Sequence, residues 1–223
     1  MSAASDARTR IVLRAAREIK DGMNVNLGIG LPTTVANYIA PGLDVYFQSE
    51  NGIIGLASAP EQGMVDPNLT DAGGGYVGAV PGAASIDSAV SFGLIRGGHL
   101  DVTVLGGLEV DELGHLANWT VPGKMIPGMG GAMDLVSGAK KVIVAMQHSA
   151  KGKSKILKRC TLPLTSTRRV SLIVTELAVI EPTDEGLELR ELAEGVTKEQ
   201  VIAATEARLI VPEHVPVMGS NKG

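Results

Sequence analysis

Short runs of consecutive apolar residues alternate along the chain with segments in which apolar residues recur every three or four positions. The first such segment predicts a helix over residues 8–20, with Gly22 as its C-terminal cap. Further helices are predicted at 33–38, 87–95, 132–137 and 198–207. Continuous apolar runs predict strands at 25–27, 45–48, 102–105, 141–146 and 170–174, with a short one near Leu187.

This alternation predicts an α/β fold, in which a mainly parallel sheet carries helices on both faces. Strands that are apolar along their whole length are typical of parallel sheets, because both faces of such sheets are covered. Ligands of these folds bind outside the carboxyl ends of the strands. Several predicted strands are followed there by glycines, among them Gly28 and Gly30. We therefore expect the functional site among these turns.

The composition is that of one folded domain. With 223 residues, of which 44% are hydrophobic and 20% charged, the chain is long enough for one substantial core and too apolar for general disorder. We expect a single domain over residues 1–223, with poorly ordered ends at 1–7 and 213–223.

Charge, aromatic content and cysteine content exclude several classes of protein. The net charge of −4 and the aromatic content of 3% argue against nucleic-acid binding, which usually needs a basic surface or stacking rings. No apolar run reaches the roughly 20 residues that span a bilayer, so no membrane association is expected. The single Cys160 cannot form an internal disulfide, and the N-terminus lacks a signal-like stretch. The expected compartment is the cytoplasm.

Several familiar motifs are incomplete. Gly28 and Gly30 lack the third glycine of a dinucleotide fingerprint, and no G-x-x-x-x-G-K-[ST] loop is present. The four histidines show no metal-ligand spacing, and with one cysteine no metal site is expected. His148 is interpreted as a structural residue.

One basic run has two open interpretations. Its members are Lys151, Lys153, Lys155, Lys158 and Arg159. A solvated surface is favoured, because charge runs usually form one. The alternative is a patch that faces a phosphorylated ligand or an acidic partner subunit.

A carboxylate follows the predicted strand 45–48. Residues 48–55 read QSENGIIG, so Glu50 lies where a buried strand ends. A buried carboxylate must be paired, hydrogen-bonded or functional, because an isolated one is costly. Position alone leaves two interpretations equally open: Glu50 accepts from the amides of Asn51 and Gly52 at a turn, or it is catalytic.

The stretch QSENGIIG resembles the signature of the family I CoA-transferases, in which the glutamate of S-E-N-G is the nucleophile. Further motifs of the same family follow the same order over roughly residues 8–212, namely LGIGLPT (27–33), FGLIRGGH (92–99), LANW (116–119), GMGGAMDL (128–135), CTLPLT (160–165) and TELAV (175–179). The resemblance implies the CoA-transferase type of α/β fold, shared with sugar-phosphate isomerases. It also implies the β (B) subunit of a two-chain enzyme, with a separate α subunit and an α2β2 heterotetramer.

The resemblance further implies a ping-pong reaction without a metal or cofactor, in which coenzyme A is a substrate. The carboxylate of Glu50 attacks an acyl-CoA thioester, giving an anhydride and then a glutamyl-CoA thioester. We expect Asn51 to orient Glu50, and the amides of Gly130 and Gly131 to stabilise the oxyanion. The residues expected to contact coenzyme A are Gly28, Gly30, Gly128, Gly130, Gly131 and Ala132.

Two stretches bear on the substrate. Residues 118–127 resemble the acetate/butyrate:acetoacetate type, and Gly74 stands where members that act on dicarboxylates tend to have lysine. A buried carboxylate without a cation is unfavourable, so we expect acetoacetate, with acetate or butyrate as the partner acid. Two alternatives stay open: an acyl-CoA hydrolase, in which water takes the acyl group, and a ligand-sensing domain of the same fold without covalent chemistry.

Overall fold

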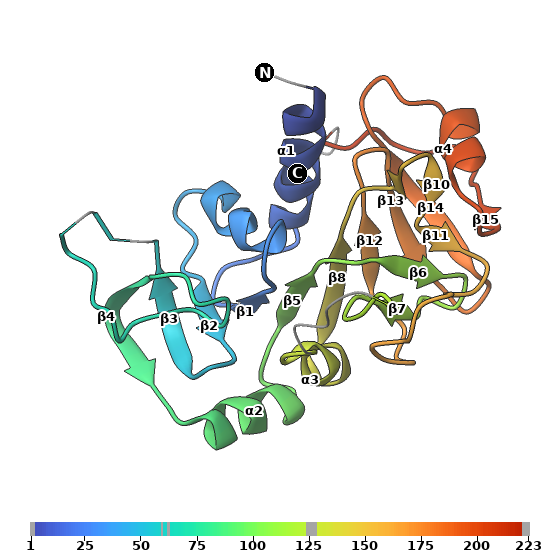
Figure 1. Cartoon of the computed structure of the whole chain (residues 1–223). Coiled ribbons are helices and arrows are strands. Elements are labelled where there is room, and N and C mark those ends of the chain that lie inside the picture. Colours follow the sequence, from blue (N-terminus) through green and yellow to red (C-terminus); the bar gives the residue numbers. More distant parts are fainter. Residues whose placement is uncertain (1–2, 59, 62, 124–128, 220–223) are drawn as a thin grey trace.

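The computed structural model describes residues 3–58, 60–61, 63–123 and 129–219, with side chains from residue 6 onward. A ten-stranded sheet runs through the molecule in the order β15-β14-β13-β12-β8-β5-β1-β2-β3-β4 (Figure 1). Its strands are β1 (Asn24–Leu27), β2 (Tyr46–Ser49), β3 (Ile53–Ala57), β4 (Gly78–Ser85), β5 (Val102–Leu105), β8 (Lys141–Ala145), β12 (Leu172–Val174), β13 (Ala178–Pro182), β14 (Leu187–Leu192) and β15 (Leu209–Ile210).

The remaining elements are shorter or lie beside this sheet. The helices are α1 (Ala3–Ala16), the 3-10 helix η1 (Pro32–Tyr38), α2 (Ser88–Arg96), α3 (Ala132–Gly138) and α4 (Lys198–Ala204). Two small sheets are formed by β6 (Glu109–Asp111), β7 (Leu116–Ala117) and β11 (Ile156–Leu157), and by β9 (Ser149–Ala150) and β10 (Lys153–Ser154).

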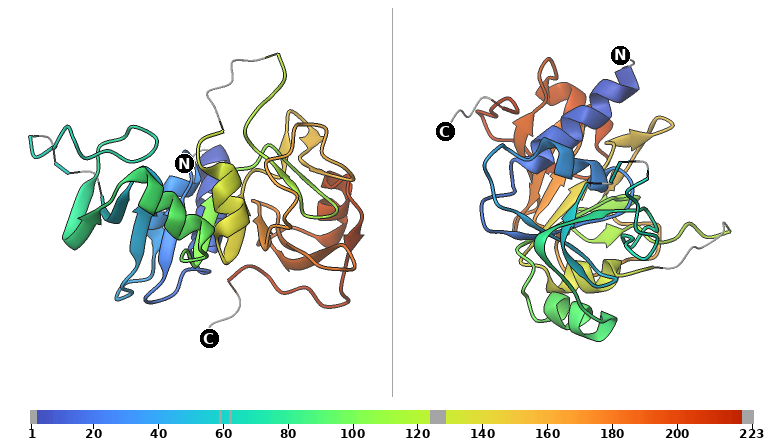
Figure 2. Two further views of the ribbon diagram at one scale, coloured as in Figure 1. Left: turned by 90° about the horizontal axis from the view of Figure 1, so that it is seen from below. Right: turned by 90° about the vertical axis from the view of Figure 1, so that its left-hand side faces the viewer.

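The predicted parallel sheet is confirmed at the centre and extended at both sides. Strands β12, β8, β5, β1 and β2 pair in parallel. Beyond them β3 and β4 on one side, and β13 and β14 on the other, pair in antiparallel fashion. Figure 2 shows that the end of the sheet formed by β3 and β4 projects away from the rest of the molecule.

Alternating side chains of the central strands divide the core into two layers, one on each face of the sheet. On β8, Val142 and Val144 belong to one buried cluster, whereas Ile143 and Ala145 belong to the other. The first cluster includes residues of α2 and α3, and the second includes residues of α1 and η1. Helices therefore cover both faces, as predicted (Figure 1).

The N-terminal helix differs in its bounds from the predicted 8–20. It spans Ala3–Ala16, so residues 3–7, expected in a poorly ordered end, are helical. It stops earlier because the chain turns after Ala16, where Glu18 and Ile19 donate to Ala15 and Ala16. At the C-terminal end, which was also expected to be poorly ordered, the backbone of Leu192 donates to Pro216 and accepts from Met218. The segment around residues 216–218 therefore lies against β14.

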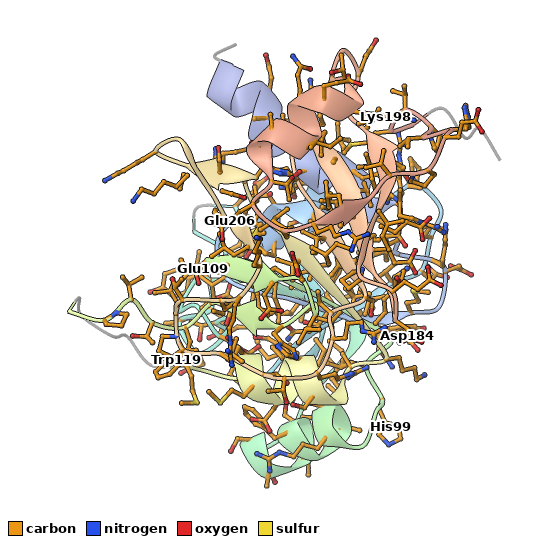
Figure 3. All side chains as sticks on the ribbon, turned by 90° about the vertical axis from the view of Figure 1, so that its right-hand side faces the viewer. His99, Glu109, Trp119, Asp184, Lys198 and Glu206 are labelled. Carbon is orange, nitrogen blue, oxygen red and sulfur yellow. The ribbon has the colours of Figure 1, made fainter. Side chains whose placement is uncertain are left out.

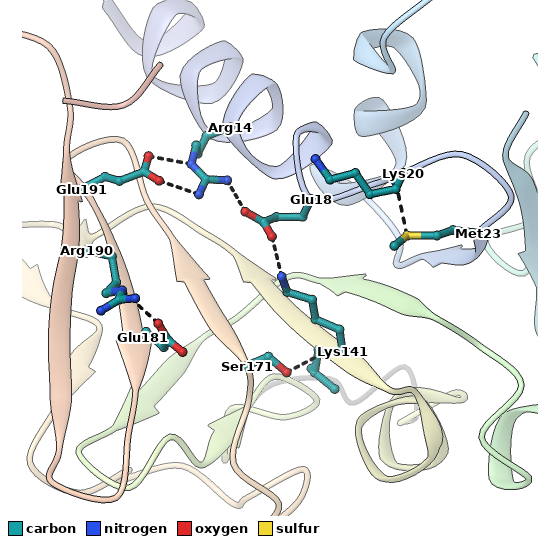
Figure 4. A network of polar contacts seen from close by, with 10 residues as sticks. Arg14, Glu18, Lys20, Met23, Lys141, Ser171, Glu181, Arg190 and Glu191 are labelled. Atoms are coloured by element: carbon teal, nitrogen blue, oxygen red, sulfur yellow. Dashed lines mark hydrogen bonds and ion pairs between the residues drawn. The ribbon is translucent and has the colours of Figure 1, made fainter. Parts of the chain in front are cut away.

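An ion-pair network fastens α1 to the sheet (Figure 4). Arg14 donates to both carboxylate oxygens of Glu191, each at 2.7 Å, and to Glu18 at 2.6 Å. Glu18 also accepts from Lys141 on β8. Burial alone would raise the pKa of Glu18, but the hydrogen bonds from Lys141 and Arg14 outweigh it and hold that pKa below its usual range. The Glu18 carboxylate is therefore charged at neutral pH, as its ion pairs with Arg14 and Lys141 require.

The small sheet β11-β6-β7 packs beside the main one and is tied to the segment that follows it. Glu109 on β6 accepts from the amide and hydroxyl of Thr161, both at 2.7 Å, and from the amide of Leu162. The indole of Trp119 donates to the carbonyl of Leu164 at 3.2 Å. Figure 3 labels Glu109 and Trp119, which lie on the same side of the molecule in that view.

Within the described residues, none of the helices combines the length and apolar character that crossing a membrane requires.

Candidate functional site

Glu50 directly follows β2, and its carboxylate is held on one side only. The side-chain amide of Asn26, on the neighbouring strand β1, donates to Oε2 of Glu50 at 3.0 Å. Asn26 is fully buried, whereas Glu50 is half-buried. One carboxylate oxygen is therefore anchored to the sheet, and the other is left to face the site.

The alternative role for Glu50, as an acceptor for the amides of the next turn, is not what the structure shows. The amide of Gly52 donates to the carbonyl of Ser49 at 2.9 Å. Gly52 has φ 121°, and a Cβ there would lie 2.0 Å from the carbonyl oxygen of Ile86, so only glycine fits. The glycine of the motif thus makes the turn from β2 to β3, while the Glu50 carboxylate turns back toward β1.

Contrary to the expectation that Asn51 orients Glu50, its side chain is bound elsewhere. Its side-chain amide donates to the carbonyl of Thr70 at 2.7 Å, because neighbouring residues at a strand end point in different directions. Ser49 supports the same segment, since its hydroxyl accepts from the amide of Ala72 at 2.9 Å. The residue that holds Glu50 is Asn26, and Asn51 instead holds the segment beside it.

Four buried polar residues behind Glu50 were missed by the sequence analysis. The amide of Asn26 also donates to the backbone and side-chain oxygens of Gln48, both at 3.1 Å, and Gln48 donates to the hydroxyl of Ser91 at 2.8 Å. The hydroxyl of Thr103 lies 3.4 Å from Oδ1 of Asn26. All four are at most 3% exposed. For Asn26, Gln48 and Thr103 the signal was a polar residue inside a predicted strand, which must find a buried partner, whereas Ser91 lies on α2 and gave no such signal.

The glycine turn before α3 packs against Glu50 from the other side. A Cβ on Gly131 would lie 3.2 Å from Cγ and 3.3 Å from Oε1 of Glu50, so this glycine allows the close approach. Gly130 has φ 52°, and the amide of Ala132 already donates to the carbonyl of Met129 at 3.3 Å. No acceptor for the amides of Gly130 and Gly131 is found among the described residues. Gly128 lies outside the described residues.

A cavity of about 520 Å³ opens beside Glu50. Its walls come from the turn after β1, from η1, from β2 to β4 and from the segment that Asn51 holds. Gly28 lines it, and a Cβ there would lie 3.0 Å from the side chain of Leu105. Gly30 is not among the described lining residues. The lining that the structure describes contains two carboxylates, Glu50 and Asp71, and no lysine, arginine or histidine.

The remaining polar features lie elsewhere or are satisfied. His148 is fully buried between the hydroxyls of Thr175 and Thr205, at 3.0 and 2.9 Å, which agrees with a structural role. In the basic run, Lys151 and Lys153 are exposed on the β9–β10 hairpin. Over the described part of the chain, no three histidine, cysteine, aspartate or glutamate residues are grouped to hold a metal ion.

Comparison with known proteins identifies the family. The family model for coenzyme A transferase matches residues 8–204. The chain is 56% identical over 207 residues to the beta chain of the acetate CoA-transferase of Escherichia coli (strain K12), covering 92% of this chain and 94% of that protein. It is 53% identical over 211 residues to the B chain of a probable succinyl-CoA:3-ketoacid coenzyme A transferase of Bacillus subtilis (strain 168), covering 94% and 98%.

Solved structures agree in fold. An acyl-CoA transferase apoenzyme from Escherichia coli O157:H7 superposes with a TM-score of 0.75 at 23% sequence identity, covering 95% of this chain. The chain spans only 43% of that longer structure, whereas it spans nearly all of the two relatives above. The chain therefore belongs to the coenzyme A transferase family, as a β (B) subunit.

Proposed function

We propose that this protein moves coenzyme A from a short-chain acyl-CoA to a carboxylic acid, with Glu50 as the nucleophile. The observation that carries the proposal is the asymmetric setting of the Glu50 carboxylate. Asn26 anchors Oε2, while Oε1 lies on the side of Gly131, and the cavity of about 520 Å³ opens beside the group. A fixed carboxylate at the wall of a cavity can attack a bound thioester without a general base.

The reaction balances without proton transfer. Oε1 of Glu50 bonds to the acyl carbon, the C–S bond breaks, and the electron pair leaves with the CoA thiolate. The thiolate then attacks Cδ of Glu50 and displaces the acyl group as a carboxylate, which leaves Glu50 as a CoA thioester. An acceptor carboxylate attacks Cδ and expels the thiolate. The thiolate takes the new acyl group and returns Glu50 as a free carboxylate.

Each of these attacks passes through an oxyanion. The amides of Gly130 and Gly131 are suited to stabilise it, since Gly131 lies beside Glu50, Gly130 directly precedes it, and neither amide has an acceptor among the described residues. Phe47 and Leu56 line the cavity and help to exclude water, which would destroy an anhydride. Exclusion of water favours transfer to an acid over hydrolysis.

The substrate we favour is a monocarboxylate pair, acetoacetate with acetate or butyrate. The two relatives differ on this point, since one is named for acetate and the other for succinyl-CoA and a 3-ketoacid. The described cavity lining contains no cation that could pair with a second carboxylate. Gly74 has no side chain and so supplies no cation to the cavity.

We further propose that a separate α subunit completes the enzyme, as an α2β2 heterotetramer in the cytoplasm. Support comes from the names of the relatives, which are single subunits of about this length. Coenzyme A enters as a substrate, and the mechanism needs no metal or resident cofactor. No nucleic acid takes part.

The test is mass spectrometry of the protein, co-expressed with its α partner and mixed with acetoacetyl-CoA. We expect a CoA adduct on the peptide that contains Glu50, sensitive to borohydride and absent in Glu50→Gln. Asp71→Asn, which removes the other carboxylate of the described cavity lining, should keep the adduct. Turnover without an adduct and without dependence on an acceptor acid would favour a hydrolase. Binding without turnover or adduct would favour a ligand-sensing domain.

A further inference from the structure

The support of Glu50 continues from the sheet into helix α2 through buried polar side chains. Asn26 contacts Glu50, Gln48 contacts Asn26, and Ser91 on α2 contacts Gln48. We call this chain of three residues the amide relay. Ser91 is fully buried and is not part of the described cavity lining. The hydrogen bonds that connect Ser91 with Glu50 run through Gln48 and Asn26.

Asn26 has fewer hydrogens than acceptors around its amide nitrogen. Two N–H groups face three oxygens: the backbone oxygen of Gln48, Oε1 of Gln48, and Oε2 of Glu50. One N–H serves the two oxygens of Gln48, which leaves the other for Glu50. The direction of the hydrogen bond from Asn26 to Glu50 therefore depends on the positions of the two Gln48 oxygens.

Gln48 in turn depends on Ser91. Its Nε2 donates to the Ser91 hydroxyl at 2.8 Å, and this turns Oε1 toward Asn26. If the Gln48 amide turned over, Nε2 would face the amide nitrogen of Asn26, and two donors would oppose each other. Without the Ser91 hydroxyl, Nε2 would be a buried donor without this acceptor, and the orientation of Gln48 would lose its main support.

We propose that Ser91 is a positioning residue for the transferase reaction. It fixes the Gln48 amide, which fixes the Asn26 amide, which holds Oε2 of Glu50 so that Oε1 attacks. This inference rests on the proposed function of Glu50. It assigns a role in the rate of covalent attack to a buried serine on α2 that is not part of the described cavity lining.

The experiment is a double-mutant cycle on the complex with the α partner. The measured quantity is the single-turnover rate constant for the Glu50–CoA adduct from acetoacetyl-CoA, together with KM. Ser91→Ala is compared with Ser91→Thr, which keeps a hydroxyl, and with Ser88→Ala, which removes an exposed serine from the same helix. Each Ser91 variant is also made in the Asn26→Ala background.

We expect Ser91→Ala to lower the rate constant by about tenfold with KM within about twofold, as for a misplaced reacting group. Ser91→Thr should recover most of the rate, and Ser88→Ala should match the parent. In the Asn26→Ala background, Ser91→Ala should have no further effect. An unchanged rate in Ser91→Ala, or the same fractional loss in both backgrounds, would overturn the relay, because general damage to α2 acts regardless of Asn26.

A second readout separates this inference from the proposed function. With asparagine labelled by ¹⁵N in the side chain, the Asn26 amide is identified by its loss in Asn26→Ala. We expect a narrow, slowly exchanging pair of signals in the parent and a broadened or shifted pair in Ser91→Ala. If the parent forms no adduct, the proposed function fails, and this signal alone decides the relay: an unchanged pair in Ser91→Ala rejects it.

Discussion

At the scale of single residues, the two oxygens of Glu50 have different surroundings. Asn26 binds Oε2 at 3.0 Å, whereas Oε1 faces a glycine whose missing side chain makes the approach possible. Gly131 has ordinary dihedral angles, φ −82° and ψ 2°, so its backbone does not require glycine. The need for glycine comes from the space beside Glu50, and this makes the position a direct probe of the site.

Replacing Gly131 with alanine should impair catalysis with little loss of stability. The new Cβ would lie 3.2 to 3.4 Å from Cγ, Oε1 and Cδ of Glu50, so the carboxylate must shift by a few tenths of an ångström. We expect kcat to fall between about 10-fold and 100-fold, in line with the cost of small misplacements. The measurement is steady-state kinetics together with thermal unfolding.

Gly93 provides the matched control for Gly131. It lies within α2, and a Cβ there meets nothing within 4 Å. Gly93→Ala should leave kcat unchanged and stabilise the helix by about 1 kcal/mol. If Gly131→Ala kept full activity, the close contact with Glu50 would have no part in the reaction.

Residue chemistry also explains which parts of the site could be predicted. The position of Glu50 after a buried strand drew attention to it but left its role open, and the resemblance of QSENGIIG to the family I CoA-transferase signature predicted the role of nucleophile. The sequence did not indicate Asn26 or Ser91, because a hydrogen bond between two elements depends on which elements are neighbours in the fold. Strand β1 pairs with β2 on one side and with β5 on the other, and that order is a property of the fold.

At the scale of elements, the sequence predicted those strands whose own residues favour a buried strand. The parallel strands β5 and β8 are mostly apolar and almost wholly buried, and they were predicted within a residue of their observed ends. Strands β3 and β4 were both missed. In β4 the sequence signal is weak, because this strand carries Gly78, Pro81 and Gly82 and is mostly exposed. Such a strand exists because β3 offers it a hydrogen-bonding edge, and sequence preference alone would not form it.

Helix α4 shows how one local signal can be tested. Thr197 accepts from the amide of Gln200, and the side chain of Gln200 accepts from the amide of Thr197 at 2.8 Å, which completes a capping box. Thr197→Ala should lower the free energy of unfolding by about 1 kcal/mol, as the loss of an N-cap does. Chemical denaturation measures it, and Thr197→Ser, which can keep the cap, should lose much less. Equal losses in both variants would mean that the hydroxyl is not the stabilising group.

At the scale of the whole molecule, His148 joins two parts that are distant in sequence. It follows β8 and lies between Thr175, after β12, and Thr205, after α4. The Thr205 hydroxyl donates to the carbonyl of Val201 at 2.7 Å, so it accepts from the ring. A protonated imidazole would also have to donate an N–H to Thr175. The hydroxyl oxygen of Thr175 already accepts from two backbone amides, so it has little capacity to accept a third hydrogen bond. The site fits a neutral imidazole with one N–H.

Burial accordingly lowers the pKa of His148 from 6.5 to about 4. Between these pH values the imidazole of the unfolded chain binds a proton and that of the folded chain does not. Acid therefore favours the unfolded state: the stability is complete above pH 6.5, falls as the pH drops toward 4, and changes no further below both values. The carboxylate of Glu176 accepts from the backbone amide of His148 at 2.9 Å, so it too faces this site.

Replacing His148 with glutamine should flatten the acid dependence of stability. The shift corresponds to about 3 kcal/mol across the window, because one pKa unit is worth about 1.4 kcal/mol. Denaturation at pH 7 and at pH 4.5 should show a fall in the free energy of unfolding that is larger for the parent than for His148→Gln by most of that amount, even if the variant is less stable at neutral pH. The exposed His214, replaced in the same way, should leave the dependence unchanged. Should His148→Gln retain the full dependence, the loss at low pH would belong to carboxylates such as Glu18, whose pKa is lowered by its hydrogen bonds within the network that fastens α1 to the sheet.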